Sequence, residues 1–238
     1  MRKMLITFVF FLISLAAGIA MASSEGPSSL TADEALQKLM DGNKRYVENN
    51  PTNSSRSDAH SRSGLAHSQK PYAIILTCSD SRVPPELIFD MGLGEIFVIR
   101  TAGNVPDLIV LGSIEYAAEH LGSSLIMVLG HERCGAVKAT VESHGKTTGS
   151  KNIDAIVKVV GTSTEAAAKD CEACKADSEC AKTRTSEFVE CVVDANAKRI
   201  AANLTRQSLI LNHLEREKKI KIVAAKYDLD NGLVSLFE

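Results

Sequence analysis

The chain has 238 residues, a formal net charge of −2, six cysteines and no tryptophan. This length is enough for one domain with a sizeable core. The near-balanced charge argues against nucleic acid or an anionic membrane surface as a partner. Six cysteines are more than one metal site needs, so the surplus requires an explanation of its own.

Residues 1–22 have the pattern of a secretory signal peptide. Met1-Arg2-Lys3 supplies positive charge, an apolar run follows to about Ile19, and Ala20-Met21-Ala22 offers a small-residue cleavage site. An uncleaved anchor is the alternative, but the run is shorter than the ~20 residues of a membrane span. We therefore expect a mature chain that starts at Ser23, is periplasmic or secreted, and has no membrane segment after cleavage.

The first part of the mature chain predicts a helix followed by a polar loop. Thr31 and Glu34 have the spacing of a capping box, in which each side chain satisfies a free amide at a helix start. Apolar residues then recur at helical spacing through Asn49. The helix is amphipathic, so it must pack its apolar face on another element. The serine-rich stretch 51–68 is predicted to be a loop.

Four apolar runs predict the strands of one mostly parallel sheet. They span residues 72–77, 95–100, 124–130 and 220–225. Helices are expected at about 106–120 and 134–143, which makes the predicted fold class α/β with helices flanking the sheet. The turn signal Asn231-Gly232 indicates that the C-terminal tail forms a hairpin-like extension.

Two of these runs are followed by motifs that contain cysteine. Thr77-Cys78-Ser79-Asp80-Ser81-Arg82 follows the first run, and Gly130-His131-Glu132-Arg133-Cys134-Gly135 follows the third. In an open parallel sheet, groups at the carboxyl ends of neighbouring strands converge in one crevice. Two thiols and an imidazole can meet there, and such a ligand set suits Zn²⁺ with a fourth position left for water. Residues 101–104 follow the second run in the same way, and a glycine there lets the backbone approach closely.

The surroundings of these ligands fit a reactive metal centre. Asp80 and Arg82 lie two residues apart after a strand, so they can form a charge-assisted pair that keeps Asp80 ionised. Asp80 could then accept a hydrogen bond from water on the metal, or instead close the site as a fourth ligand. Cys134 lies where a helix starts, and the positive end of that helix favours a thiolate. Gly135 is small and leaves room for substrate.

The two motifs, in this order and each after a strand, closely resemble those of the β-class carbonic anhydrases. The resemblance covers residues 31–145 and resumes at the C-terminal strand. It implies a zinc enzyme that converts CO₂ and water to bicarbonate and a proton. By this resemblance, the zinc ligands are Cys78, His131 and Cys134. The Asp-Arg pair beside the metal is Asp80 and Arg82.

Three further positions match the plant-type members of that family. Gln69 precedes the first strand, Phe97 lies in the second, and Tyr116 lies in the following helix. The resemblance implies that Gln69 donates to an oxygen of CO₂ or bicarbonate, and that the two aromatic rings form an apolar wall; core packing is their alternative role. Family members associate through their N-terminal helices and strand edges. We therefore expect a dimer or tetramer, with Gln69 and Phe97 reaching the partner's pocket.

The surplus cysteines lie in a segment that the family core does not require, at about 162–195. They are Cys171, Cys174, Cys180 and Cys191. In an exported chain they are expected to form two disulfides, for which three connectivities exist; a second metal site is the alternative. If the segment is helical, Cys171 and Cys174 share one face, which favours the nested pairs Cys174–Cys180 and Cys171–Cys191. A short helix at 153–160 and a long helix at 189–214 flank this segment.

Two other functions fit parts of this sequence. The same zinc site could hydrolyse a CO₂ analogue such as carbon disulfide or carbonyl sulfide, because the ligands would be identical. A non-catalytic zinc-binding or thiol-redox protein could be built around the cysteine-rich segment, but it would not need the Asp-Arg pair or the pocket residues. We predict one domain over 23–238, with CO₂ or bicarbonate as its small-molecule substrate.

Overall fold

A five-stranded sheet forms the centre of the computed structural model, which describes residues 30–172 and 186–237. The strands lie in the order β2-β1-β3-β4-β5. Their bounds are β1 Ala73–Thr77, β2 Ile96–Arg100, β3 Leu125–His131, β4 Lys221–Tyr227 and β5 Val234–Leu236. The first four strands are parallel and β5 pairs antiparallel with β4. The mostly parallel α/β fold is therefore confirmed, as is the C-terminal hairpin.

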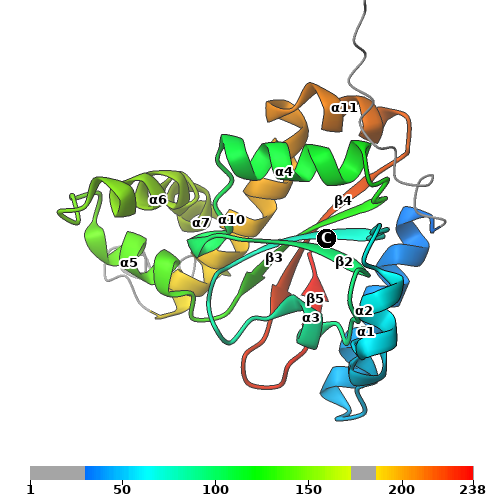
Figure 1. The fold of residues 1–238 in the computed structure, drawn as a ribbon. Coiled ribbons are helices and arrows are strands. Elements are labelled where there is room, and N and C mark those ends of the chain that lie inside the picture. Colours follow the sequence, from blue (N-terminus) through cyan, green and yellow to red (C-terminus); the bar gives the residue numbers. More distant parts are fainter. Residues whose placement is uncertain (1–29, 173–185, 238) are drawn as a thin grey trace, which may run out of the picture.

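Helices cover both faces of the sheet (Figure 1). One face packs against α1 (Ala32–Val47) and the short α3 (Pro85–Ile88). The other face packs against α4 (Leu108–Glu119), α10 (Ser186–Gln207) and α11 (Leu209–Arg216). Alternate residues of β1 enter the two cores, which explains why this strand is a continuous apolar run.

A third core lies beyond the carboxyl ends of the strands, on the left in Figure 1. It is formed by α5 (Gly135–Ser143), α6 (Lys151–Gly161), α7 (Thr164–Asp170) and the first turns of α10. Cys78 and Cys134 are buried in this cluster rather than in either face of the sheet. The third core therefore encloses the end of the sheet that carries both cysteine motifs.

The N-terminal region contains more structure than the sequence predicted. Thr31 and Glu34 form the expected capping box at the start of α1. The stretch predicted as a loop contains a 3-10 helix, η1 (Asn53–Arg56), and a helix, α2 (Ala59–Gly64). The Asp58 side chain caps α2 by accepting from the Ser61 amide at 2.8 Å. The sequence did not predict these short helices because serine and aspartate are common both in loops and at helix N-caps, so a serine-rich composition does not distinguish the two.

The predicted long helix 189–214 is wrong as a single element. It is two helices, α10 and α11, because Ser208 has extended backbone angles and caps α11. The Ser208 hydroxyl accepts from the Leu211 amide at 3.1 Å and donates to Glu115 at 2.5 Å. None of the helices within the described residues has the length and apolar character that a membrane crossing requires.

Candidate metal centre

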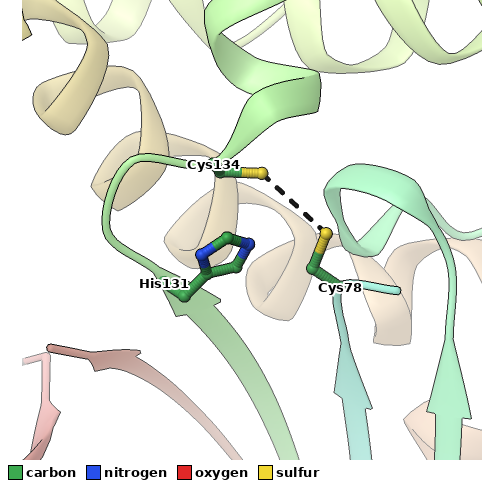
Figure 2. Close-up of side chains that lie close together, drawn as sticks. All are labelled: Cys78, His131 and Cys134. Carbon is green, nitrogen blue, oxygen red and sulfur yellow. Dashed lines mark hydrogen bonds between the residues drawn. The ribbon is translucent and has the colours of Figure 1, made fainter. Parts of the chain in front are cut away.

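Three buried side chains meet at the carboxyl end of the sheet. Cys78 follows β1, His131 ends β3, and Cys134 is the N-cap of α5. Because β1 and β3 are neighbours, their carboxyl ends bring these residues together. The two sulfur atoms are 3.9 Å apart, and the ligand atoms of all three residues lie within 4.8 Å of one another. Figure 2 shows both thiols and the imidazole turned toward the same point.

His131 is held in the orientation of a metal ligand. Its Nδ1 atom is 2.8 Å from the carbonyl oxygen of Glu132. A carbonyl only accepts, so Nδ1 carries the proton and Nε2 presents its lone pair. The Nε2 atom is buried and has no hydrogen-bond partner among the described residues. A buried, unsatisfied ring nitrogen next to two thiols fits a bound metal ion.

The two thiols differ in their affinity for a proton. A hydrogen bond from Cys134 lowers the pKa of Cys78 to about 4, and the Gly103 amide, 3.4 Å from the Cys78 sulfur, acts in the same direction. The same bond to Cys78, together with burial, raises the pKa of Cys134. Two sulfurs and one imidazole nitrogen form a donor set that fits Zn²⁺.

Asp80 lies beside these residues and forms a bidentate ion pair with Arg82. The guanidinium donates from Nε to Oδ1 at 2.9 Å and from Nη2 to Oδ2 at 2.8 Å, and the Arg82 amide donates to Oδ1 at 3.0 Å. The side-chain bonds from Arg82 hold the pKa of Asp80 well below its ordinary value. Asp80 Oδ2 is 3.9 Å from His131 Nε2. An ionised carboxylate of fixed orientation thus borders the ligand set.

Arg100 is a contributor that the sequence interpretation missed. It ends β2, in register with Thr77, and its guanidinium donates to the carbonyl oxygens of Cys78 at 3.0 Å and Asp80 at 2.6 Å. These bonds fix the backbone of the first ligand loop. The sequence signal that could have identified it is a basic residue at the end of an apolar strand that lies next to the motif strand.

The predicted pocket residues are not all gathered at the ligands within one chain. Gly135 follows Cys134, and an added Cβ there would meet nothing within 4 Å. Gln69 is exposed and precedes β1, at the opposite end from Cys78. Phe97 is half-buried and pairs with Ile74 near the start of β1. Tyr116 is 46% exposed on α4.

One of the two predicted disulfides is confirmed. Cys171, at the end of α7, is bonded to Cys191 in α10, with a Cα–Cα distance of 5.6 Å. Cys174 and Cys180, and the predicted signal peptide, lie outside the described residues. The disulfide ties two helices of the third core, at its edge, while Cys78 and Cys134 remain free of any disulfide.

A family model described as carbonic anhydrase matches residues 73–234, more than half of the chain. The chain belongs to the carbonic anhydrase family. Carbonic anhydrase 2 from Mycobacterium tuberculosis is 55% identical over 107 residues, which are 45% of this chain and 51% of that protein. The chain thus spans about half the length of the curated relatives that it matches.

Solved structures of carbonic anhydrases extend the likeness to the fold. The β-carbonic anhydrase of Coccomyxa, solved with acetazolamide, is 27% identical with a TM-score of 0.64, over 85% of this chain and 86% of that chain. A tetrameric β-carbonic anhydrase of Sordaria macrospora has a TM-score of 0.65 at 20% identity, over 85% of this chain and 96% of that chain. The resemblance to the β-class predicted from the two cysteine motifs is confirmed.

Proposed function

We propose that the protein is a zinc carbonic anhydrase that interconverts CO₂ with bicarbonate and a proton. The observation that carries the proposal is the convergence of two buried thiols and a free imidazole nitrogen beside an ionised carboxylate. Membership in the carbonic anhydrase family supports the same reaction. Cys78, His131 and Cys134 would hold the zinc.

The chain's own residues have distinct tasks in this reaction. When bound, zinc supplies a Lewis acid that lowers the pKa of a water molecule toward neutrality. Asp80 is held ionised by Arg82, so it accepts hydrogen bonds and cannot donate them. A water molecule beside it must donate to the carboxylate, and a lone pair is thereby left free to attack the substrate carbon. Arg100 keeps the backbone of this loop in place.

A second copy of the chain would complete the pocket. Gln69 lies at the amino end of β1 and Phe97 lies on the edge strand β2, so neither is at the ligands of its own chain. The free side of β2 and the exposure of Leu108 (86%) and Ile109 (78%) on α4 support self-association. The tetrameric relative from Sordaria macrospora supports it as well. Light scattering of the purified protein would give the assembly size, and a monomer at micromolar concentration would contradict this part.

We also propose that the protein is periplasmic or secreted. The disulfide between Cys171 and Cys191 supports an oxidising compartment, since such bonds rarely persist in the cytosol. Cell fractionation with N-terminal sequencing tests this proposal. We expect a mature chain that begins at Ser23, whereas an uncleaved cytosolic protein would contradict it.

The activity is tested by stopped-flow CO₂ hydration on protein of known metal content. We expect about one zinc per chain, loss of hydration when a chelator removes it, and recovery when zinc is returned. Full hydration activity in metal-free protein would refute the zinc assignment. Zinc-loaded protein without hydration activity would refute the reaction.

A further inference from the structure

Helix α10 carries a buried amide that no part of the reaction above uses. Asn196 is only 1% exposed and lies among apolar residues of α10 such as Val192, Val193 and Ile200. A polar group in such a place is costly unless its hydrogen bonds are made. Its partners therefore indicate why an amide occupies the position.

The amide of Asn196 has a single possible orientation. Its Oδ1 accepts from the Ser163 hydroxyl at 3.1 Å and from Arg199 Nη2 at 3.4 Å. Arginine only donates, so the atom that faces it must be the oxygen. The Nδ2 group consequently faces the carbonyl oxygen of Gly103, to which it donates at 3.0 Å. Arg199 also donates to Ser163 at 2.8 Å, which fixes that hydroxyl.

Gly103 in turn contacts a metal ligand directly. Its amide N–H donates to the Cys78 sulfur at 3.4 Å. Gly103 has a φ of +69°, and an added Cβ would lie 3.2 Å from Val160 and 3.3 Å from Ala136. A side chain here would be strained, so glycine is favoured, but glycine also has the greatest backbone freedom. The bond from Asn196 to the Gly103 carbonyl adds a contact from outside the loop to the loop's own bond between the Asn104 amide and the Thr101 carbonyl, and so helps to keep the Gly103 N–H on the sulfur.

We propose that Asn196 is a positioning residue for the ligand Cys78, acting through Gly103. By fixing the Gly103 carbonyl, it keeps the Gly103 N–H directed at the Cys78 sulfur, and so orients that sulfur toward the metal and tunes its donor strength. The inference rests on the zinc site of the proposed function. Outer groups that orient metal ligands typically change metal affinity by ~10–100-fold.

The test is Asn196→Asp. The substitution keeps the size and an acceptor for Ser163 and Arg199, but places an oxygen against the Gly103 carbonyl. We expect the zinc affinity, measured by competition with a chelator, to fall by ~10-fold or more. In cobalt-substituted protein we also expect a shifted thiolate-to-cobalt charge-transfer band, which a loss of general stability would not produce.

A matched control exists elsewhere in the chain. Asn43 in α1 is also 1% exposed, and its Nδ2 donates to the carbonyl oxygens of Gly232 at 2.8 Å and Ile88 at 3.1 Å. Asn43→Asp makes the same chemical change on the opposite face of the sheet, where the partners of the amide are Ile88, Gly232 and Val234. Equal affinity losses in Asn43→Asp and Asn196→Asp, with an unshifted cobalt band, would overturn the proposal.

A second variant keeps the test decisive if Asn196→Asp does not fold. Ser163→Ala removes the hydroxyl that orients the Asn196 amide and leaves the amide itself. We expect the zinc affinity and the cobalt band to change in the same direction as in Asn196→Asp, but by less. If neither quantity differs from its value in Asn43→Asp, the inference is overturned. Wild-type protein that binds no metal through Cys78 would overturn the proposed function as well. An active zinc enzyme with unresponsive variants would overturn only the role of Asn196.

Discussion

The loop after β1 and the loop after β3 both carry residues of the proposed metal site, but different contacts hold them. In the first loop, basic side chains provide the anchors. Arg82 grips the Asp80 carboxylate, and Arg100 donates to the carbonyl oxygens of Cys78 and Asp80. These partners lie within the loop itself or on the adjacent strand, so most anchors of this loop are local; the contact from Asn196 of α10 through Gly103 is the exception.

In the second loop, acceptors from the last third of the chain provide the anchors. Glu190 of α10 accepts from the Arg133 amide at 2.7 Å, and the Tyr227 carbonyl of β4 accepts from the Glu132 amide at 3.1 Å. Arg133 has a φ of +50°, an uncommon conformation for a residue with a side chain. Distant packing therefore determines the second loop, whereas the side chains that hold the first loop come mainly from neighbouring residues.

The largest expected effect comes from breaking the ligand set itself. Cys78→Ser replaces a thiolate by a hydroxyl, which is a far weaker zinc ligand at neutral pH. We expect both the bound zinc and CO₂ hydration to be lost, as measured by metal analysis and stopped-flow assay. A variant that keeps full zinc occupancy would remove Cys78 from the ligand set.

The second-largest expected effect tests whether Asp80 takes part in the reaction or only holds the first loop through its pair with Arg82. Asp80→Asn keeps the size of the side chain but removes the charge that Arg82 grips. We expect zinc to be retained and turnover to fall by ~10²-fold or more, the scale of removing a positioned acid–base or electrostatic group. Near-normal turnover would leave Asp80 as an architectural partner of Arg82 alone.

A smaller effect tests whether the second loop depends on α10. Glu190→Ala removes the acceptor for the Arg133 amide, while Lys226 keeps its pair with Asp194 at 2.9 Å. We expect the zinc affinity to fall by ~10-fold, in the range of outer-sphere changes. Glu190→Gln is the matched control, since it keeps an acceptor oxygen. If alanine and glutamine give the same affinity, the bond to Arg133 does not support the ligands.

The difference between the loops also explains what the sequence could predict. The four predicted strands begin within one residue of β1, β2, β3 and β4, because unbroken apolar runs are a local signal. Asp80 and Arg82 lie two residues apart in one turn, so their proximity follows from the backbone. The first ligand loop was therefore accessible to sequence reasoning, apart from Arg100 and the distant contact from Asn196.

The contacts that hold the second loop were not accessible in this way. Glu190 is a polar residue in a helix, and its position beside Arg133 depends on how β4 packs against α10. Ser208 ends α10 within a stretch whose apolar spacing continues into α11. Helix α7 was missed because its sequence is short and rich in alanine, without an apolar stripe. Each of these features is decided by tertiary packing rather than by local pattern.

The smallest effect on activity is expected from removing the disulfide between Cys171 and Cys191. This disulfide lies next to Glu190, which holds the second loop through the Arg133 amide. Cys191 directly follows Glu190, and its bond to Cys171 ties α7 to α10. Replacing both by serine should lower the free energy of unfolding by ~2–4 kcal/mol, because the unfolded chain gains freedom.

Zinc content and most of the hydration activity should nevertheless survive this double substitution. Val192, Val193 and Ile200 pack α10 in the core without help from the disulfide, so the bond between Glu190 and Arg133 stays in place. Chemical denaturation and metal analysis of the double variant measure the two quantities separately. Unlike an added thiol reductant, which can itself bind zinc, the substitution leaves Cys78 and Cys134 unchanged. Zinc loss in parallel with the lost stability would mean that the disulfide, and not the packing of α10, holds the second ligand loop.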